Sequence, residues 1–132
     1  MLPWKLVYPC ARALLLLVAL LAPASVGAAT IYVPSGGNLQ AALNQARPGD
    51  TVLLEPGATF VGNFILPAHG GTSYVTVRSA ASNDLLPRAG QRMSPAFAPY
   101  LPKIKSSNTI QSMATAPGAG YWRLLFLEFQ AN

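Results

Sequence analysis

The carboxylates, which could serve as acids, bases or metal ligands, are few in this sequence and far apart. Asp50, Glu55, Asp84 and Glu128 each stand alone along the chain. A calcium ion needs several oxygen ligands gathered together, and no Asp-x-Asp pair supplies them. Two distant carboxylates could still meet in space as a hydrolytic pair, but their positions give no indication of one. We expect Asp50 and Glu55 to stabilise turns and Glu128 to face solvent.

The candidate binding residues are cationic or aromatic. Arg78 and Arg123 stand on expected strands and could face a groove, although an ordinary exposed arginine is the simpler interpretation of each. His69 is the only histidine and lies in a glycine-rich loop, where a solvated ring is the usual case. Tyr121 and Trp122 could stack on a ligand or pack in the core. Since no P-loop, Rossmann glycine pattern, HExxH or GxSxG motif occurs either, the sequence assigns no catalytic, cofactor-binding or metal-binding residue.

Composition limits the kinds of protein this chain can be. Of its 132 residues, 52% are hydrophobic and 10% are charged, against about 25% charged in a typical globular domain. The length allows at most one domain. Nine Lys and Arg residues against four Asp and Glu residues give a net charge of +5, which is spread too thinly for a nucleic-acid footprint.

The N-terminus has the pattern of an export signal. Lys5 and Arg12 precede a continuous apolar run over residues 13–22, and small residues follow it. Cleavage is expected after Ala28, with Ala29 as the near alternative, and the protein is then secreted or periplasmic. The apolar run is about half of the ~20 residues that a membrane-spanning helix needs. An uncleaved anchor is the alternative interpretation, and no stable membrane span is expected after cleavage.

The expected domain organisation is a signal peptide over residues 1–28 and one domain over residues 29–132. The only cysteine, Cys10, lies inside the leader and upstream of its apolar run, where a lipid-modified cysteine would not stand. The mature chain therefore contains no disulfide, thiolate nucleophile or cysteine metal ligand. Seven basic and four acidic residues give it a net charge of +3.

The mature chain predicts short strands and one helix. Asn38 can cap a helix over residues 39–46, where apolar residues recur at i, i+3, i+4 and i+7. The alternation of Val75 and Val77 with polar neighbours predicts that these two face inward. Pro-Gly turns are expected at 47–50, 55–58 and 116–119. Strands are expected over residues 30–33, 51–54, 59–66 with a bend at Gly62-Asn63, 74–78, 103–105, 109–111 and 121–130.

Residues 80–102 form an expected irregular loop. Pro87, Pro95, Pro99 and Pro102 interrupt regular structure there. Such a long excursion is uncommon in a compact domain unless it is functional or mobile. Arg88 and Arg92 within it could attract polyanions, but solvated side chains are the simpler interpretation.

The spacing of the strands indicates a coil. Val52 and Val75 are 23 positions apart, with one further strand and two turns between them. Three short strands in every ~20–25 residues are typical of a parallel β-helix. Such a coil has an open apolar end that needs a cap, and the helix expected before the first coil has the right form for one.

These residues together are similar to a known family. The matching segments are Ile31-Tyr32-Val33, the run Gly37–Leu43, the run Arg47–Leu54, Pro56-Gly57, Gly62-Asn63-Phe64 and Val75–Ser79. In this order they resemble the N-terminal part of secreted right-handed parallel β-helix proteins, the pectin-lyase-like superfamily. The likeness is good over residues 31–79 and looser up to residue 129. It implies a mainly β fold: the start of a right-handed parallel β-helix with a short N-terminal capping helix, whose further coils are expected to be missing from this chain.

The resemblance also implies a function. Members are lyases, hydrolases, epimerases and esterases of uronic-acid polymers, whose substrate lies along an outer sheet face, where arginine can act as base or carboxylate clamp. Because members usually have many coils, we expect a fragment of a polysaccharide-active protein, without a complete active site, whose catalytic coils lie beyond Asn132. Its partner would be an acidic polysaccharide, and no cofactor is indicated. The alternatives are a non-catalytic surface or adhesin-type glycan-binding β-helix and a small all-β domain complete in itself, so whether the chain is an enzyme stays open.

Overall fold

The computed structural model describes residues 27–132. The expected leader over residues 1–28, with Cys10, lies outside the described residues apart from its last two positions. Its cleavage therefore stays a prediction. Within the described part of the chain, no helix is both long and apolar enough to cross a membrane.

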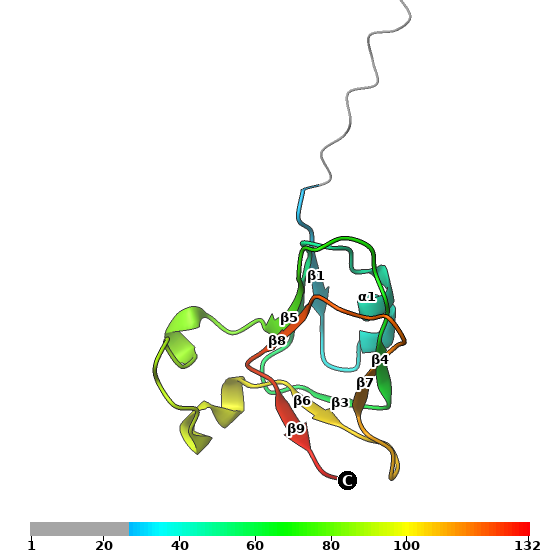
Figure 1. Cartoon of the computed structure of the whole chain (residues 1–132). Helices are drawn as coiled ribbons and strands as arrows, with labels where there is room; N and C mark the ends of the chain where they lie inside the picture. The colour runs from blue at the N-terminus through cyan, green and yellow to red at the C-terminus, as the bar shows by residue number, and fades with distance from the viewer. Residues whose placement is uncertain (1–26) are drawn as a thin grey trace, which may run out of the picture.

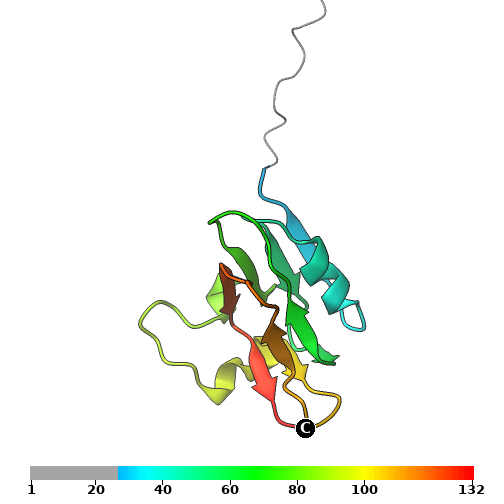
Figure 2. The same cartoon turned by 45° about the vertical axis from the view of Figure 1, so that its right-hand side comes forward.

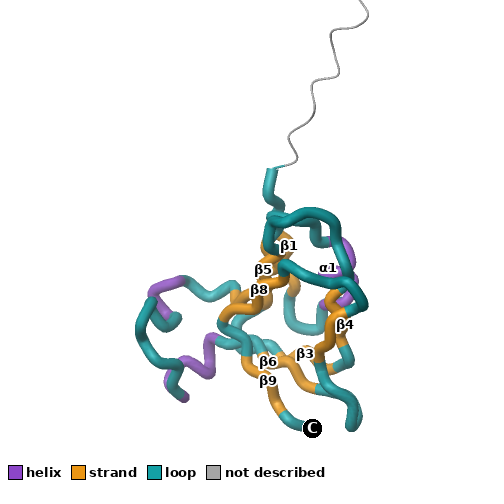
Figure 3. The backbone as a smooth tube through the Cα atoms, viewed as in Figure 1, coloured by secondary structure: helices purple, strands orange, loops and turns teal. Residues whose placement is uncertain are grey.

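The described chain is mainly β, with one α-helix and two short 3₁₀ helices (Figures 1 and 3). In chain order the elements are β1 (Thr30–Val33), α1 (Leu39–Gln45), β2 (Thr51–Leu54), β3 (Thr59–Val61), β4 (Phe64–Leu66), β5 (Val75–Ser79), η1 (Asn83–Leu85), η2 (Pro95–Tyr100), β6 (Lys103–Lys105), β7 (Met113–Thr115), β8 (Trp122–Leu125) and β9 (Glu128–Gln130).

The strands form three parallel sheets. Their orders are β1-β2-β5-β8, β3-β6-β9 and β4-β7, and every pairing is parallel. From β2 onward, successive strands belong to the first, second and third sheet in turn, and the next strand along the chain belongs to the first sheet again. Successive strands consequently stack on one another in each sheet, as Figure 2 shows from the side.

The core lies between the sheets and follows the strand alternation. Val52, Val75, Val77 and Ile104 are fully buried. In β5 the two valines face inward while Arg78 is partly exposed on the other side, which confirms the predicted alternation. The register pairs Val52 with Val77, so that like positions stack from one turn to the next.

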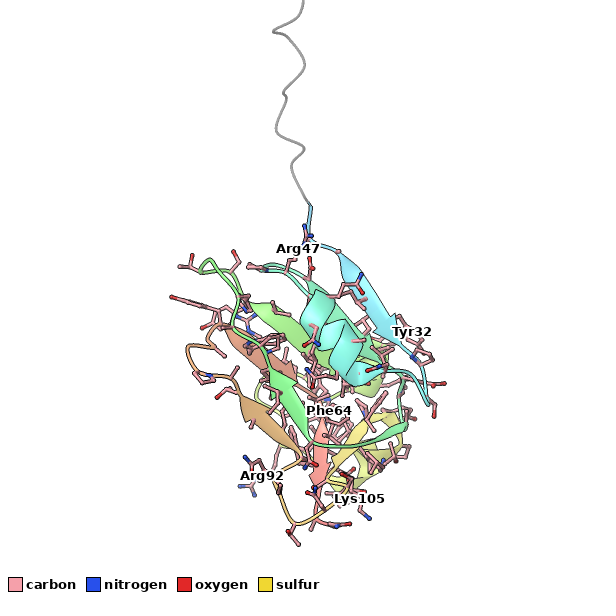
Figure 4. The ribbon with its side chains drawn as sticks, turned by 90° about the vertical axis from the view of Figure 1, so that its right-hand side faces the viewer. Tyr32, Arg47, Phe64, Arg92 and Lys105 are labelled. Carbon is pink, nitrogen blue, oxygen red and sulfur yellow. The ribbon has the colours of Figure 1, made fainter. Side chains whose placement is uncertain are left out.

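Helix α1 covers the free edge of β4. Asn38 caps it by accepting a hydrogen bond from the Ala41 N–H at 2.9 Å, as predicted, and Leu43 on the inner face of the helix is fully buried. The Gln40 side-chain amide donates to the Ile65 carbonyl and accepts from the Ile65 N–H, both at 2.8 Å. Gln40 therefore takes the place of a neighbouring strand. Figure 4 shows α1 beside the strand that begins at Phe64.

Replacing Gln40 with alanine should lower the free energy of unfolding by about 1 kcal/mol. The change removes the two hydrogen bonds to Ile65 and one to Asn44 Oδ1 on the same helix. Each contributes about 0.5–1.5 kcal/mol net at most, and water can largely replace them at this exposed edge. Urea unfolding followed by circular dichroism measures the loss. Gln45→Ala, on the exposed side of the same helix, is the matched control and should stay within about 0.5 kcal/mol of the wild type. Equal stability of the two variants would contradict the role given to Gln40.

The three Pro-Gly turns have the predicted geometry. Gly49, Gly57 and Gly118 have φ values of 95°, 74° and 76°, in the region that favours glycine. In each turn the amide that follows glycine donates to the carbonyl three residues earlier, at 2.9 to 3.2 Å. These turns carry the chain into the next strand.

Two expected strands were wrong. Residues 109–111 are not a strand, because the Ser106 hydroxyl holds the chain in a loop: it donates a hydrogen bond to the Asn108 carbonyl and accepts one from the Asn108 N–H. The next strand begins only at β7. Residues 121–130 form two strands, β8 and β9, separated by Phe126 with φ 54°. That corner moves the chain from the first sheet to the second. The expected bend at Gly62-Asn63 is confirmed and divides β3 from β4.

The excursion over residues 80–102 leaves the stack of sheets as a separate lobe (Figure 1). It holds η1 and η2 and a small apolar cluster of Ala81, Leu86 and Leu101, against which Tyr100 and Phe126 pack. Fully buried Ser79 ties the lobe to the sheet, since its Oγ donates to the Tyr100 carbonyl at 2.5 Å. The lobe thereby borders the outer face of the first sheet.

Candidate functional site: a cationic groove on the first sheet

A groove of about 530 Å³ lies on the outer face of the first sheet. One wall is formed by Ser79, the last residue of β5, and by the start of the excursion up to Asn83. The floor is built by outward-facing residues of β1, β2, β5 and β8: Thr30, Leu53, Thr51, Thr76, Arg78, Arg123 and Leu125.

The parallel register aligns the floor residues in a row. Thr30 is paired with Thr51, Thr51 with Thr76, and Thr76 with Arg123. Arg78 lies two residues after Thr76 and therefore faces the same side. The Cα atoms of Arg78 and Arg123 are thus expected about 8 Å apart, as diagonal neighbours on adjacent strands. The groove floor therefore combines three threonine hydroxyl groups with two guanidinium groups.

Arg78 is held in place by the excursion. Its Nε donates to the Ser79 carbonyl at 3.1 Å, and its Nη2 donates to Asn83 Oδ1 at 2.7 Å. The guanidinium carbon also lies 5.3 Å from the centre of the Phe126 ring. A guanidinium group has five N–H donors, so donors remain for a ligand in the groove. The side chain is pre-positioned for an anion.

Arg123 is exposed and is oriented by an aromatic ring. Its guanidinium carbon lies 4.5 Å from the centre of the Tyr74 ring, which in turn makes an edge-to-face contact with Tyr121 at 5.7 Å. The groove lining includes no carboxylate. Among the described residues, the one ion pair joins Lys103 to Glu128 at 3.7 Å, outside this lining. The groove is therefore positively charged and suited to anionic groups.

The carboxylates singled out in the sequence do not meet in a site. Asp50 is buried and accepts hydrogen bonds from the Ala29 and Arg47 N–H groups, each at 2.8 Å, which confirms its role in the turn. Glu55 accepts from the Ser35 N–H. Glu128 is only partly exposed, in its ion pair with Lys103. Asp84 lies exposed in η1.

The other predicted candidates are separated from the groove floor. Trp122 donates to the Pro67 carbonyl at 3.0 Å and lies edge-on to His69 at 5.3 Å, so these two rings pack together. Arg88 and Arg92 are exposed on the excursion and do not line the groove. Within residues 27–132, no group of three or more His, Cys, Asp or Glu side chains could hold a metal ion.

Sequence reasoning missed Tyr74, Asn83 and the row of threonines. The threonines stand at positions 30, 51 and 76, so the spacing changes from one turn to the next and no fixed period reveals them. Asn83 follows Arg78 by five residues, but its contact depends on the path of the excursion.

Comparison with known proteins gives one structural likeness that carries an argument. No protein-family model matches the chain, and no curated protein matches it. The crystal structure of an alginate lyase from Paenibacillus sp. str. FPU-7 is similar, with a TM-score of 0.54 and 23% sequence identity. The match covers 79% of this chain and 32% of that chain. This likeness concerns the fold, and the present chain spans about a third of the lyase's length.

Proposed function

We propose that this chain is the N-terminal part of an exported, right-handed parallel β-helix protein of the pectin-lyase-like kind that acts on acidic polysaccharides. The observation that carries the proposal is the pair of partly exposed Arg78 and exposed Arg123, diagonal neighbours on one outer sheet face with no carboxylate in the lining. The structural likeness to an alginate lyase supports it.

The β-helix assignment rests on the route of the chain. Two full turns, β2 to β4 and β5 to β7, place one strand in each of three parallel sheets, and α1 covers the edge of β4 at the start. At the other end, Leu124 and Phe129 align with the fully buried Val77 and Ile104 but are 37% and 51% exposed. Further coils stacked on β8 and β9 would bury these side chains, as the fragment proposal requires.

The proposed role of the groove is to bind uronate units. Arg78 and Arg123 hold carboxylates, because a guanidinium group donates two parallel hydrogen bonds to a carboxylate. The Thr51 and Thr76 hydroxyl groups exchange hydrogen bonds with sugar hydroxyls. The catalytic base is assigned to the further coils. A hydrolase or lyase of uronate polymers is thus the proposed activity of the whole protein.

A non-catalytic glycan-binding β-helix is the second candidate. It is favoured by the absence of carboxylates from the groove lining, since general acid and base groups in glycosidases are usually Asp or Glu. Turnover separates the two candidates. The whole protein should release unsaturated or reducing sugar ends if it is an enzyme and should bind without release if it is an adhesin.

Calorimetric titration of the full 132-residue chain tests the proposal. Oligomers of alginate or polygalacturonate should bind, and the affinity should fall as salt is raised because charge attraction is screened. A dextran oligomer of the same length is the neutral control and should show no binding. Failure of both uronate oligomers to bind, or equal binding of dextran, would overturn the proposal.

Asn83→Ala should weaken uronate binding about 3- to 5-fold. The change frees the Arg78 Nη2 group from its 2.7 Å hydrogen bond, so that ordering of the guanidinium must then occur on binding, at about 0.5–1.5 kcal/mol per side chain. Calorimetry measures the affinity. Asn44→Ala, on the exposed side of α1 and outside the groove lining, is the control and should leave the affinity unchanged. An unchanged affinity in Asn83→Ala would show that Asn83 does not position Arg78.

The export proposal predicts the first residue of the mature protein. Expressed with its own leader, the chain should appear outside the cytoplasm and begin at Ala29. N-terminal sequencing of the exported material measures this. An intact Met1 terminus on membranes would instead show an uncleaved anchor.

A further inference from the structure

We propose that Tyr74 and Tyr121 form a sugar-stacking subsite that extends the cationic groove beyond Arg123. This inference rests on the proposed function, because it concerns the same polysaccharide. The ligand class is a pyranose ring, which presents a face of C–H groups to the negative face of an aromatic ring. The sequence alone makes Tyr121 a candidate for stacking on a ligand, whereas Tyr74 becomes its partner only in the fold.

Both rings are available to a ligand. Tyr74 is 47% and Tyr121 is 45% exposed. Their planes meet at 70°, with the ring centres 5.7 Å apart, so the two rings face different directions, and the Arg123 guanidinium lies over one face of the Tyr74 ring. The contact of Arg123 with Tyr74, at 4.5 Å, joins the pair to the groove floor.

The two backbones are fixed by hydrogen bonds. The Tyr121 carbonyl accepts from the Val75 N–H at 2.9 Å, and the Tyr74 carbonyl accepts from the Gly49 N–H at 3.1 Å. Next to Tyr121, the indole of Trp122 donates to Pro67 at 3.0 Å. Tyrosine side chains on such a fixed backbone lose little conformational freedom when a ligand binds. The subsite is therefore pre-organised.

The backbone at Tyr121 supports a functional reason for its side chain. Its φ is 57°, in the left-handed region that bulky L residues rarely adopt and that glycine or asparagine tolerates better. Strained residues of this kind are concentrated at ligand sites. The ring is exposed, so core burial does not explain why tyrosine stands there.

Replacement of Tyr121 by asparagine and by phenylalanine tests the subsite. Asparagine accepts the positive φ but removes the ring, and the affinity of the full chain for an alginate oligomer should fall about 5-fold. The salt dependence of binding should not change, because no charge is lost. Tyr121→Phe keeps the ring and should bind within about 2-fold of the wild type.

Tyr32→Thr is the matched control, since Tyr32 is an exposed tyrosine on β1 that does not line the groove. It should bind like the wild type. If the wild type binds alginate and Tyr121→Asn binds equally well, the subsite is overturned while the groove stands. If the wild type does not bind any uronate oligomer, the proposed function and the subsite both fail.

Discussion

Replacing both Arg78 and Arg123 with alanine should lower the affinity of the chain for a uronate oligomer by about 100-fold. Each arginine is expected to give at least one charge-assisted hydrogen bond, at the lower end of the usual 1.5–3 kcal/mol because the groove is open to water. A change of 1.4 kcal/mol corresponds to 10-fold in affinity. The residual binding should depend less on salt, since two charges are gone. Calorimetry at two salt concentrations measures both effects.

The control for this variant removes the same charge elsewhere. Arg88→Ala with Arg92→Ala also removes two positive charges, but from exposed positions that do not line the groove. That variant should lose no more than about 3-fold in affinity, through the weaker long-range field alone. A similar loss in both double variants would mean that net charge, and not the groove, binds the polymer. Circular dichroism on each variant excludes unfolding as the cause.

Leu43→Ala should cost about 2–5 kcal/mol of unfolding free energy. Leu43 lies on the inner face of α1, fully buried in the core, and truncating such a leucine leaves a cavity. Small domains are stable by only about 5–15 kcal/mol, so the loss is a large fraction of the total. Urea unfolding measures it. A loss below about 1 kcal/mol would show that α1 does not seal the core.

Local sequence signals were sufficient for much of the fold. Asn38 marks the start of α1 because its side chain can bond a free helix N–H, and that bond is present. The Pro-Gly turns were predictable because only glycine readily adopts the positive φ they contain. The expected strand 109–111 was wrong because its β-branched residues are held in a loop by side-chain hydrogen bonds of Ser106 and Asn108, which strand propensity does not report.

The site was less predictable than the fold. Arg78 and Arg123 could each be selected as strand residues, but their shared groove depends on pairing β5 with β8 across the long excursion. The start of β9 could not be predicted, because the corner at Phe126 lies in an apolar run in which nothing indicates a residue with left-handed φ. Tyr74 became a candidate only when the register placed Arg123 over its ring.

The most direct test of the central claim is an NMR titration of the isotopically labelled full chain with an alginate oligomer. We expect the backbone amide signals of Thr51, Thr76, Arg78 and Arg123 to shift together and saturate at one affinity. Signals from the loop 106–112, on another part of the surface, should stay unchanged. Shifts confined to that loop, or no saturable shifts on the outer face of the first sheet, would contradict the account.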